Sequence, residues 1–140
     1  MDRRTFLTLT AATSLSLPLS MRAAGAAPID YAPGLVTERL KAGETVFLDF
    51  KASWCSTCRA QERVLDALKA ENPAYEQAIT FINVDWDDFG NSDLVKSLNI
   101  PRRSTLVVLK GNQELGRIVA GTGTAEIKAL VDTALAAAVA

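Results

Sequence analysis

The chain contains no histidine and only two cysteines among its 140 residues. Without histidine, Ser-His-Asp and Cys-His nucleophilic catalysis and all His-ligated zinc sites are excluded. Two cysteines are too few for a disulfide-stapled miniprotein, or for a four-cysteine zinc or iron–sulfur site within one chain. The two that remain, Cys55 and Cys58, form a Cys-x-x-Cys pair and are therefore the first candidates for chemistry.

The chain also lacks an excess of charge of either sign. It has 15 Lys and Arg against 16 Asp and Glu, which is a formal net charge of −1. No electrostatic argument therefore favours nucleic acid or an anionic membrane as a partner, and we expect neither. A content of 49% hydrophobic and 22% charged residues is typical of one ordinary globular domain.

The first 27 residues are typical of an export signal, because charged, apolar and small residues follow one another in that order. Arg3-Arg4-Thr5-Phe6-Leu7 resembles the core of bacterial twin-arginine signals. We expect cleavage near Ala26-Ala27 and a periplasmic location. The alternatives are an uncleaved signal that tethers the protein and an N-terminal helix of the domain. The sequence thus predicts a twin-arginine-type signal peptide over residues 1–27 and one domain over residues 28–140.

The apolar patterns of this domain predict alternating helices and strands, followed by a hairpin and a closing helix. The expected elements are helices over 32–41, 55–70, 93–98 and 124–138, and strands over 45–50, 79–84, 104–109 and 114–119. Thr124 is expected to cap the last helix. This order predicts an α/β domain in which α-helices flank a central mixed β-sheet.

The two cysteines are expected at the start of the helix over 55–70. Backbone N–H groups and the positive end of the helix dipole favour an anion there, so Cys55 is expected to have a lowered pKa. Since the thiolate attacks disulfides, Cys55 would attack and Cys58, one turn further on, would resolve the mixed disulfide. A structural disulfide and half of a metal site shared between two chains are the alternatives.

The segment Leu48–Cys58 resembles the active-site strand and turn of the thioredoxin family, with an acid six residues before the first cysteine and a tryptophan directly before it. Further similarities lie at Asn83-Val84-Asp85, Thr105-Leu106, Lys110-Gly111 and Gly121. The resemblance implies a thioredoxin-like fold and a thiol:disulfide oxidoreductase, with no cofactor and no metal, that acts as a monomer on protein thiols and disulfides.

The export signal and the Ser56-Thr57 pair between the cysteines resemble periplasmic members of the family. Such members imply a reductant of protein disulfides in cytochrome c maturation or disulfide repair, with an inner-membrane thiol transporter as electron donor. The alternative, with the opposite direction of exchange, is a protein that donates its disulfide to its substrates. A non-catalytic thioredoxin-fold module that binds peptide or metal is the alternative from another class of function.

The resemblance also implies roles for five further residues. Asp49 would accept or donate the proton of Cys58 during resolution; an acid at a strand end facing water is the alternative. Trp54, Arg103, Ser104 and Gly121 would line the substrate groove. The alternatives are a plain core residue for Trp54 and a turn residue for Gly121.

Two positions depart from the family pattern. Ser104 stands where thioredoxins have a cis-proline that faces the cysteines. Because a cis bond before a non-proline residue costs about 2.5 to 4 kcal/mol, we expect the Arg103–Ser104 bond to be trans. A shifted alternative places Pro101 in the role of that proline. Phe81 stands where cytosolic thioredoxins have a lysine near the buried acid, so the charge of Asp49 is expected to be less well compensated.

Overall fold

The computed structural model describes residues 27–140, and the predicted signal peptide, apart from Ala27, lies outside the described residues. The strands are β1 (Ile29–Asp30), β2 (Thr45–Lys51), β3 (Thr80–Asp85), β4 (Thr105–Lys110) and β5 (Gln113–Val119). The helices are α1 (Leu35–Lys41), α2 (Ser56–Glu71), α3 (Ala74–Ala78), α4 (Trp86–Phe89), α5 (Asp93–Ser97) and α6 (Thr124–Val139).

The five strands form one mixed sheet in the order β1-β3-β2-β4-β5. Strands β1 and β2 run parallel to β3, whereas β4 runs antiparallel to β2 and β5 antiparallel to β4. Strand β2 is thus central and buried on both faces, as its continuous apolar run predicts. The predicted fold class, a mixed sheet flanked by helices, is confirmed.

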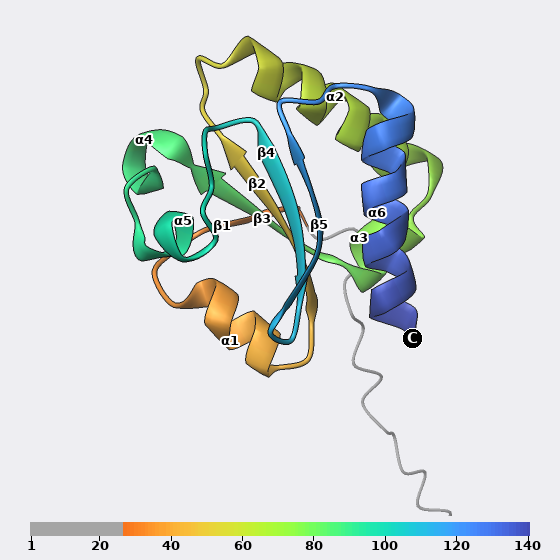
Figure 1. Ribbon diagram of the computed structural model, residues 1–140. Helices are drawn as coiled ribbons and strands as arrows, with labels where there is room; N and C mark the ends of the chain where they lie inside the picture. The colour runs from red at the N-terminus through yellow and green to blue at the C-terminus, as the bar shows by residue number, and fades with distance from the viewer. Residues whose placement is uncertain (1–26) are drawn as a thin grey trace, which may run out of the picture.

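Helices cover both faces of the sheet (Figure 1). On one face, Phe47 and Leu106 pack with residues of α2, α3 and α6 such as Leu65 and Ile127. On the other face, a second cluster of buried residues that includes Leu48 packs under α1, α4 and α5. Side chains along β2 point alternately into the two cores, so the strand is packed on both faces. The C-terminal end of this strand leads into α2.

Three elements were not predicted from the sequence, namely β1, α3 and α4. They have 2, 5 and 4 residues, which is too short for a hydrophobic period to be visible. The expected cap at Thr124 is wrong. Thr124 is the first residue of α6, and the extended backbone of Gly123, with φ −69° and ψ 133°, takes the cap position without a side-chain hydrogen bond.

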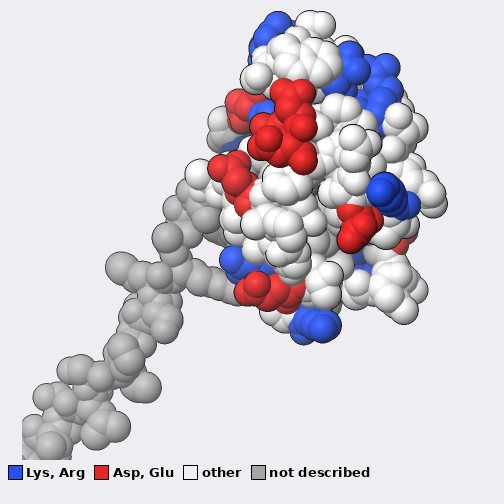
Figure 2. Space-filling view, turned by 90° about the vertical axis from the view of Figure 1, so that its left-hand side faces the viewer, with Lys and Arg blue, Asp and Glu red and all other residues white. Residues whose placement is uncertain are grey.

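The face that carries α4 and α5 shows acidic and basic side chains in separate small groups (Figure 2). No single-sign surface covers this face, in keeping with the nearly balanced composition. Among residues 27–140, no helix combines the length and the apolar character that crossing a bilayer requires.

Candidate active site

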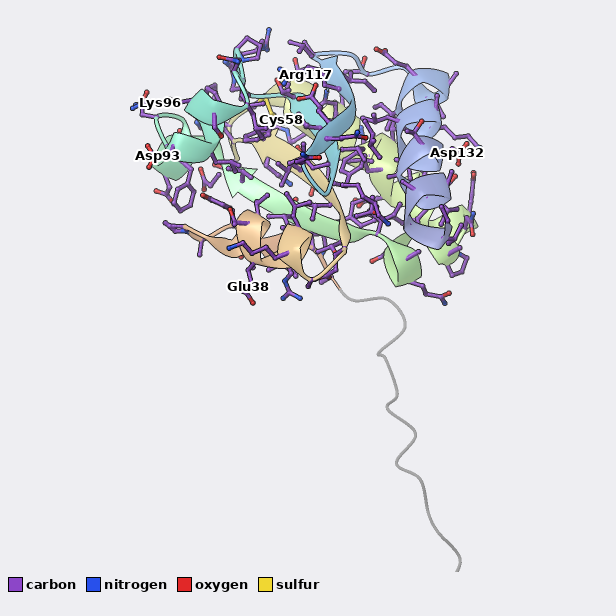
Figure 3. The ribbon with its side chains drawn as sticks, turned by 60° about the horizontal axis from the view of Figure 1, so that its bottom comes forward. Glu38, Cys58, Asp93, Lys96, Arg117 and Asp132 are labelled. Carbon is purple, nitrogen blue, oxygen red and sulfur yellow. A yellow bond between two sulfur atoms is a disulfide. The ribbon has the colours of Figure 1, made fainter. Side chains whose placement is uncertain are left out.

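Cys55 and Cys58 form a disulfide at the N-terminal end of α2, with 5.2 Å between their Cα atoms (Figure 3). Cys55 is the N-cap residue of α2, and its sulfur accepts a hydrogen bond of 3.1 Å from the backbone N–H of Cys58. This contact places the sulfur of Cys55 where the helix favours an anion, as predicted. Both cysteines are nearly buried, with 2% and 1% of their surface exposed.

The hydroxyl of Ser104 touches both sulfurs. Its Oγ lies 3.1 Å from Sγ of Cys55 and 3.1 Å from Sγ of Cys58. The described residues contain no cis peptide bond, so the bond before Ser104 is trans, as expected. Pro101 is exposed, and it is Ser104 that faces the disulfide; the shifted alternative for Pro101 is therefore wrong.

Trp54 lies at the surface beside the disulfide, with 54% of its surface exposed, so its interpretation as a core residue is wrong. The indole N–H donates to the carboxylate of Asp87 at 3.0 Å. The guanidinium of Arg103 stacks on the ring, 4.4 Å from its centroid. A cation over one face and a hydrogen bond at the edge hold the indole in one orientation and thereby shape the rim of the site.

Asp49 lies on β2, six residues before Cys55, and is only 6% exposed, which excludes an acid facing water. Its Oδ1 is buried and has no hydrogen-bond partner. Burial therefore raises the pKa of Asp49 from 3.8 to about 7, although the nearby Lys51 lowers it in part. A carboxyl group that titrates near neutral pH can both accept and donate a proton under ordinary conditions.

Asp49 lines a small cavity of about 30 Å³ beneath α2, which is enough for a water molecule. The α2 residues at this cavity are Glu62, Leu65, Asp66 and Lys69. They follow Cys58 by 4, 7, 8 and 11 residues and so continue the helix face on which Cys58 lies. The buried acid is thus placed below the stripe of α2 that begins with the second cysteine.

Two lysines flank this cavity. Lys51 forms an ion pair of 2.9 Å with Glu62, and Lys69 stacks over the ring of Phe81 at 4.2 Å. Burial lowers the pKa of the Lys69 ammonium. Although Phe81 replaces the lysine expected near the acid, a lysine from α2 therefore lies over that ring and supplies part of the missing positive charge.

Gly121 lies in the loop between β5 and α6, where close packing leaves no room for a side chain. A methyl group there would come within 2.8 Å of the side chain of Ile118 and 2.5 Å of that of Glu126. The carbonyl oxygen of Gly121 accepts a hydrogen bond of 2.9 Å from the side chain of Gln61. Its close contacts are thus with its own chain, and contact with a substrate stays a prediction.

Two residues at the site were missed by the sequence analysis. Trp86, the first residue of α4, packs against the small cluster formed by Ala52 and the two cysteines. Gln61, on α2, is fully buried and donates to loop carbonyls beside the disulfide. A signal for Gln61 was present, because it stands at helical spacing with Val64, Leu65 and Leu68, where an apolar residue is expected.

The part of the chain that the structure describes contains no cluster of three or more Cys, Asp or Glu side chains placed to hold a metal ion. The chemistry that the geometry itself offers is that of two sulfurs, one hydroxyl and one buried carboxyl group.

Comparison with known proteins agrees with this geometry. The family model for thioredoxin matches residues 36–133. The chain is 29% identical over 92 residues to a thioredoxin of Echinococcus granulosus, a match that covers 66% of this chain and 79% of that protein. It is 33% identical over 81 residues to the mitochondrial thioredoxin-2 of Schizosaccharomyces pombe, with 58% and 56% covered. The crystal structure of Trxlp from Edwardsiella tarda superposes with a TM-score of 0.60 at 28% identity and covers 74% of this chain and 95% of that one.

Proposed function

This chain belongs to the thioredoxin family and is a thiol–disulfide oxidoreductase, and we propose that it reduces protein disulfides in the periplasm. The observation that carries the proposal is the Cys55–Cys58 disulfide at the helix N-terminus. The buried acid Asp49 on the preceding strand, whose pKa is raised to about 7, supports it. A thiolate favoured at Cys55 and a proton acceptor on the Cys58 side of α2 are what two successive thiol–disulfide exchanges require.

In the reducing direction, the thiolate of Cys55 attacks one sulfur of a substrate disulfide. The substrate S–S bond breaks, a bond between Cys55 and the substrate forms, and the other substrate sulfur leaves as a thiolate and is protonated. Cys58 then loses its proton to Asp49 and attacks Cys55. The Cys55–Cys58 disulfide forms, and the second substrate thiolate leaves and takes up a proton, so that two electrons pass from the dithiol to the substrate.

Substrate binding is assigned, in this proposal, to the rim around the disulfide. Trp54 offers an exposed apolar ring, and Arg103 beside it offers a cation. Ser104 and Gly121 lie in the loops before β4 and α6, where Ser104 contacts the two sulfurs and both residues accept a hydrogen bond from Gln61. An extended substrate segment would pass over this rim with its disulfide above Cys55, since extended peptides are bound through main-chain hydrogen bonds and through pockets for their side chains.

The reduction potential tests the direction of exchange. We expect a reduction potential of about −270 mV, as in thioredoxin. Such a value would mark a reductant that needs an electron supply, such as an inner-membrane thiol transporter. The potential is measured by equilibrating the purified protein against glutathione buffers, followed by alkylation of free thiols. A value of about −120 mV is typical of a strong disulfide donor and would reverse the proposed direction of exchange.

Export is tested at the twin arginines. We propose that Arg3 and Arg4 direct the chain to the twin-arginine route, because the pair of arginines is the feature that distinguishes these signals. Changing Arg3→Lys and Arg4→Lys together keeps the charge and is expected to leave the uncleaved chain in the cytoplasm of a bacterial host. Arg22→Lys, in the same segment, is the matched control and is expected to reach the periplasm. Equal export of the two variants would exclude the twin-arginine route.

A further inference from the structure

Ser104 has a backbone conformation that serine rarely adopts. Its φ is +62°, in the left-handed region, where a residue with a Cβ atom is strained. Such a conformation persists only when its surroundings hold it, and strained residues of this kind cluster at functional sites. The surroundings of Ser104 are therefore informative about what its hydroxyl does.

Three hydrogen bonds hold the backbone of Ser104. Its N–H donates to the carbonyl of Phe50 on β2 at 2.7 Å. Its carbonyl accepts from the N–H of Ala120 at 2.8 Å and from the side-chain amide of Gln61 at 2.9 Å. The first two are backbone bonds that any residue except proline could donate at positions 104 and 120, whereas the third depends on the residue at position 61.

Gln61 uses both hydrogens of one amide nitrogen for two different loops. Nε2 donates to the carbonyl of Ser104, in the loop before β4, and to that of Gly121, in the loop before α6, at 2.9 Å each. The amide oxygen is buried and has no partner, which is a cost that an apolar residue would avoid. The amide nitrogen is thus the part of Gln61 that gains from burial, and it ties the helix of the two cysteines to the loops beside them.

We propose that Gln61 is a positioning residue that holds Ser104 in its strained conformation, so that the Ser104 hydroxyl donates a hydrogen bond to whichever cysteine sulfur carries the negative charge. The hydroxyl has one hydrogen and lies 3.1 Å from each sulfur, so it can serve either sulfur by rotation about one bond. During exchange, the charge lies first on Cys55 and later on Cys58. One hydroxyl then stabilises both thiolates without giving up its proton.

This inference rests on the thiol–disulfide exchange of the proposed function, but it is tested on the reduced protein without any substrate. The rate at which iodoacetamide alkylates Cys55 is measured against pH, because this rate follows the thiolate fraction. In Ser104→Ala we expect the midpoint of the profile to move to higher pH and the rate on its acidic side to fall about tenfold, since a hydrogen bond to a charged group is lost. In Gln61→Met, which keeps length and burial, we expect a shift in the same direction with a fall of about threefold.

A double-variant cycle separates positioning from general packing. If Gln61 acts through Ser104, then adding Gln61→Met to Ser104→Ala changes the profile no further. Gln113→Met, at an exposed position on β5, is the matched control and is expected to leave the profile unchanged. An unchanged profile in Gln61→Met, or an equal effect with and without the Ser104 hydroxyl, would overturn the proposal.

If Gln61→Met does not fold, a second variant still tests whether the Ser104 hydroxyl stabilises the thiolate. Ser104→Gly removes the hydroxyl and also relieves the left-handed strain, because glycine adopts positive φ at little cost. We expect it to shift the alkylation profile as Ser104→Ala does while its urea midpoint is equal or higher. A profile like that of the wild type in Ser104→Gly would show that the hydroxyl does not stabilise the thiolate. The reduction potential and the export test can fail independently of this outcome.

Discussion

Cys58→Ser is expected to stop turnover and to leave a stable mixed disulfide between Cys55 and a substrate protein. Without the second thiol, nothing displaces the substrate from Cys55, so the covalent intermediate accumulates. In the reduction of insulin by dithiothreitol, the rate is expected to fall to that of dithiothreitol alone. In a periplasmic extract, the partner is isolated as a complex that dithiothreitol releases.

Cys55→Ser is the matched control for this result. Serine keeps a cap oxygen at the start of α2, so the helix is expected to remain intact. The variant is expected to lose turnover to the same level but to trap no partner, because the attacking thiol is absent. If wild type and Cys55→Ser are equally inactive on insulin and Cys58→Ser traps nothing, the non-catalytic binding module is the better description of this chain.

Asp49→Asn is expected to stabilise the protein at alkaline pH. Asp49 titrates at about 7 when folded and near 4 when unfolded, so the folded chain holds a proton that the unfolded chain has lost between these values. The free energy of unfolding therefore falls as pH rises from about 4 to about 7 and stays lowered above that range. Asparagine removes this loss, which amounts to at most about 4 kcal/mol at pH 8 and vanishes at pH 4. Urea unfolding at the two pH values measures it.

The same substitution is expected to slow turnover. Without the carboxylate that takes the proton of Cys58, resolution at pH 8 is expected to be about a hundredfold slower. In the wild type, the turnover rate is expected to rise as the pH passes about 7, where Asp49 loses its proton. This rise should be absent in Asp49→Asn. Asp66→Asn is the matched control, because Asp66 lines the same cavity but is exposed. A wild-type pH profile in Asp49→Asn, with no gain in stability at pH 8, would contradict the role given to the buried acid.

The larger elements of the fold were predictable because their signals are local. The apolar run of β2 and the stripe of α2 are each visible within a few residues, and the structure places both within one or two residues of the expected bounds. The four-residue helix α4 has no such period, and its apolar residues Trp86 and Phe89 pack against a core built from distant parts of the chain. Short elements of this kind are decided by tertiary packing rather than by pattern.

The side chain of Arg103 shows what the sequence could not predict about the site. Arg102 and Arg103 stand directly before Ser104, the residue that faces the two sulfurs. In the structure the guanidinium of Arg103 stacks on Trp54, and the side chain of Arg102 donates to the carbonyl of Arg103 at 3.1 Å. Proximity along the chain did not determine where these long side chains point, because the exposed indole offers a cation a better surface than a nearly buried sulfur does.

By itself, the sequence determined the position of the two cysteines at a strand–helix junction, and from that position it predicts which sulfur attacks and which resolves. These properties depend on the direction of one helix and on a spacing of three residues. Only the tertiary structure decided that Ser104 touches both sulfurs, that Gln61 holds Ser104, and that Asp49 is buried without a partner. These contacts join residues more than 40 positions apart, and no local pattern of polarity records them, because they arise only when helix α2 packs on the sheet.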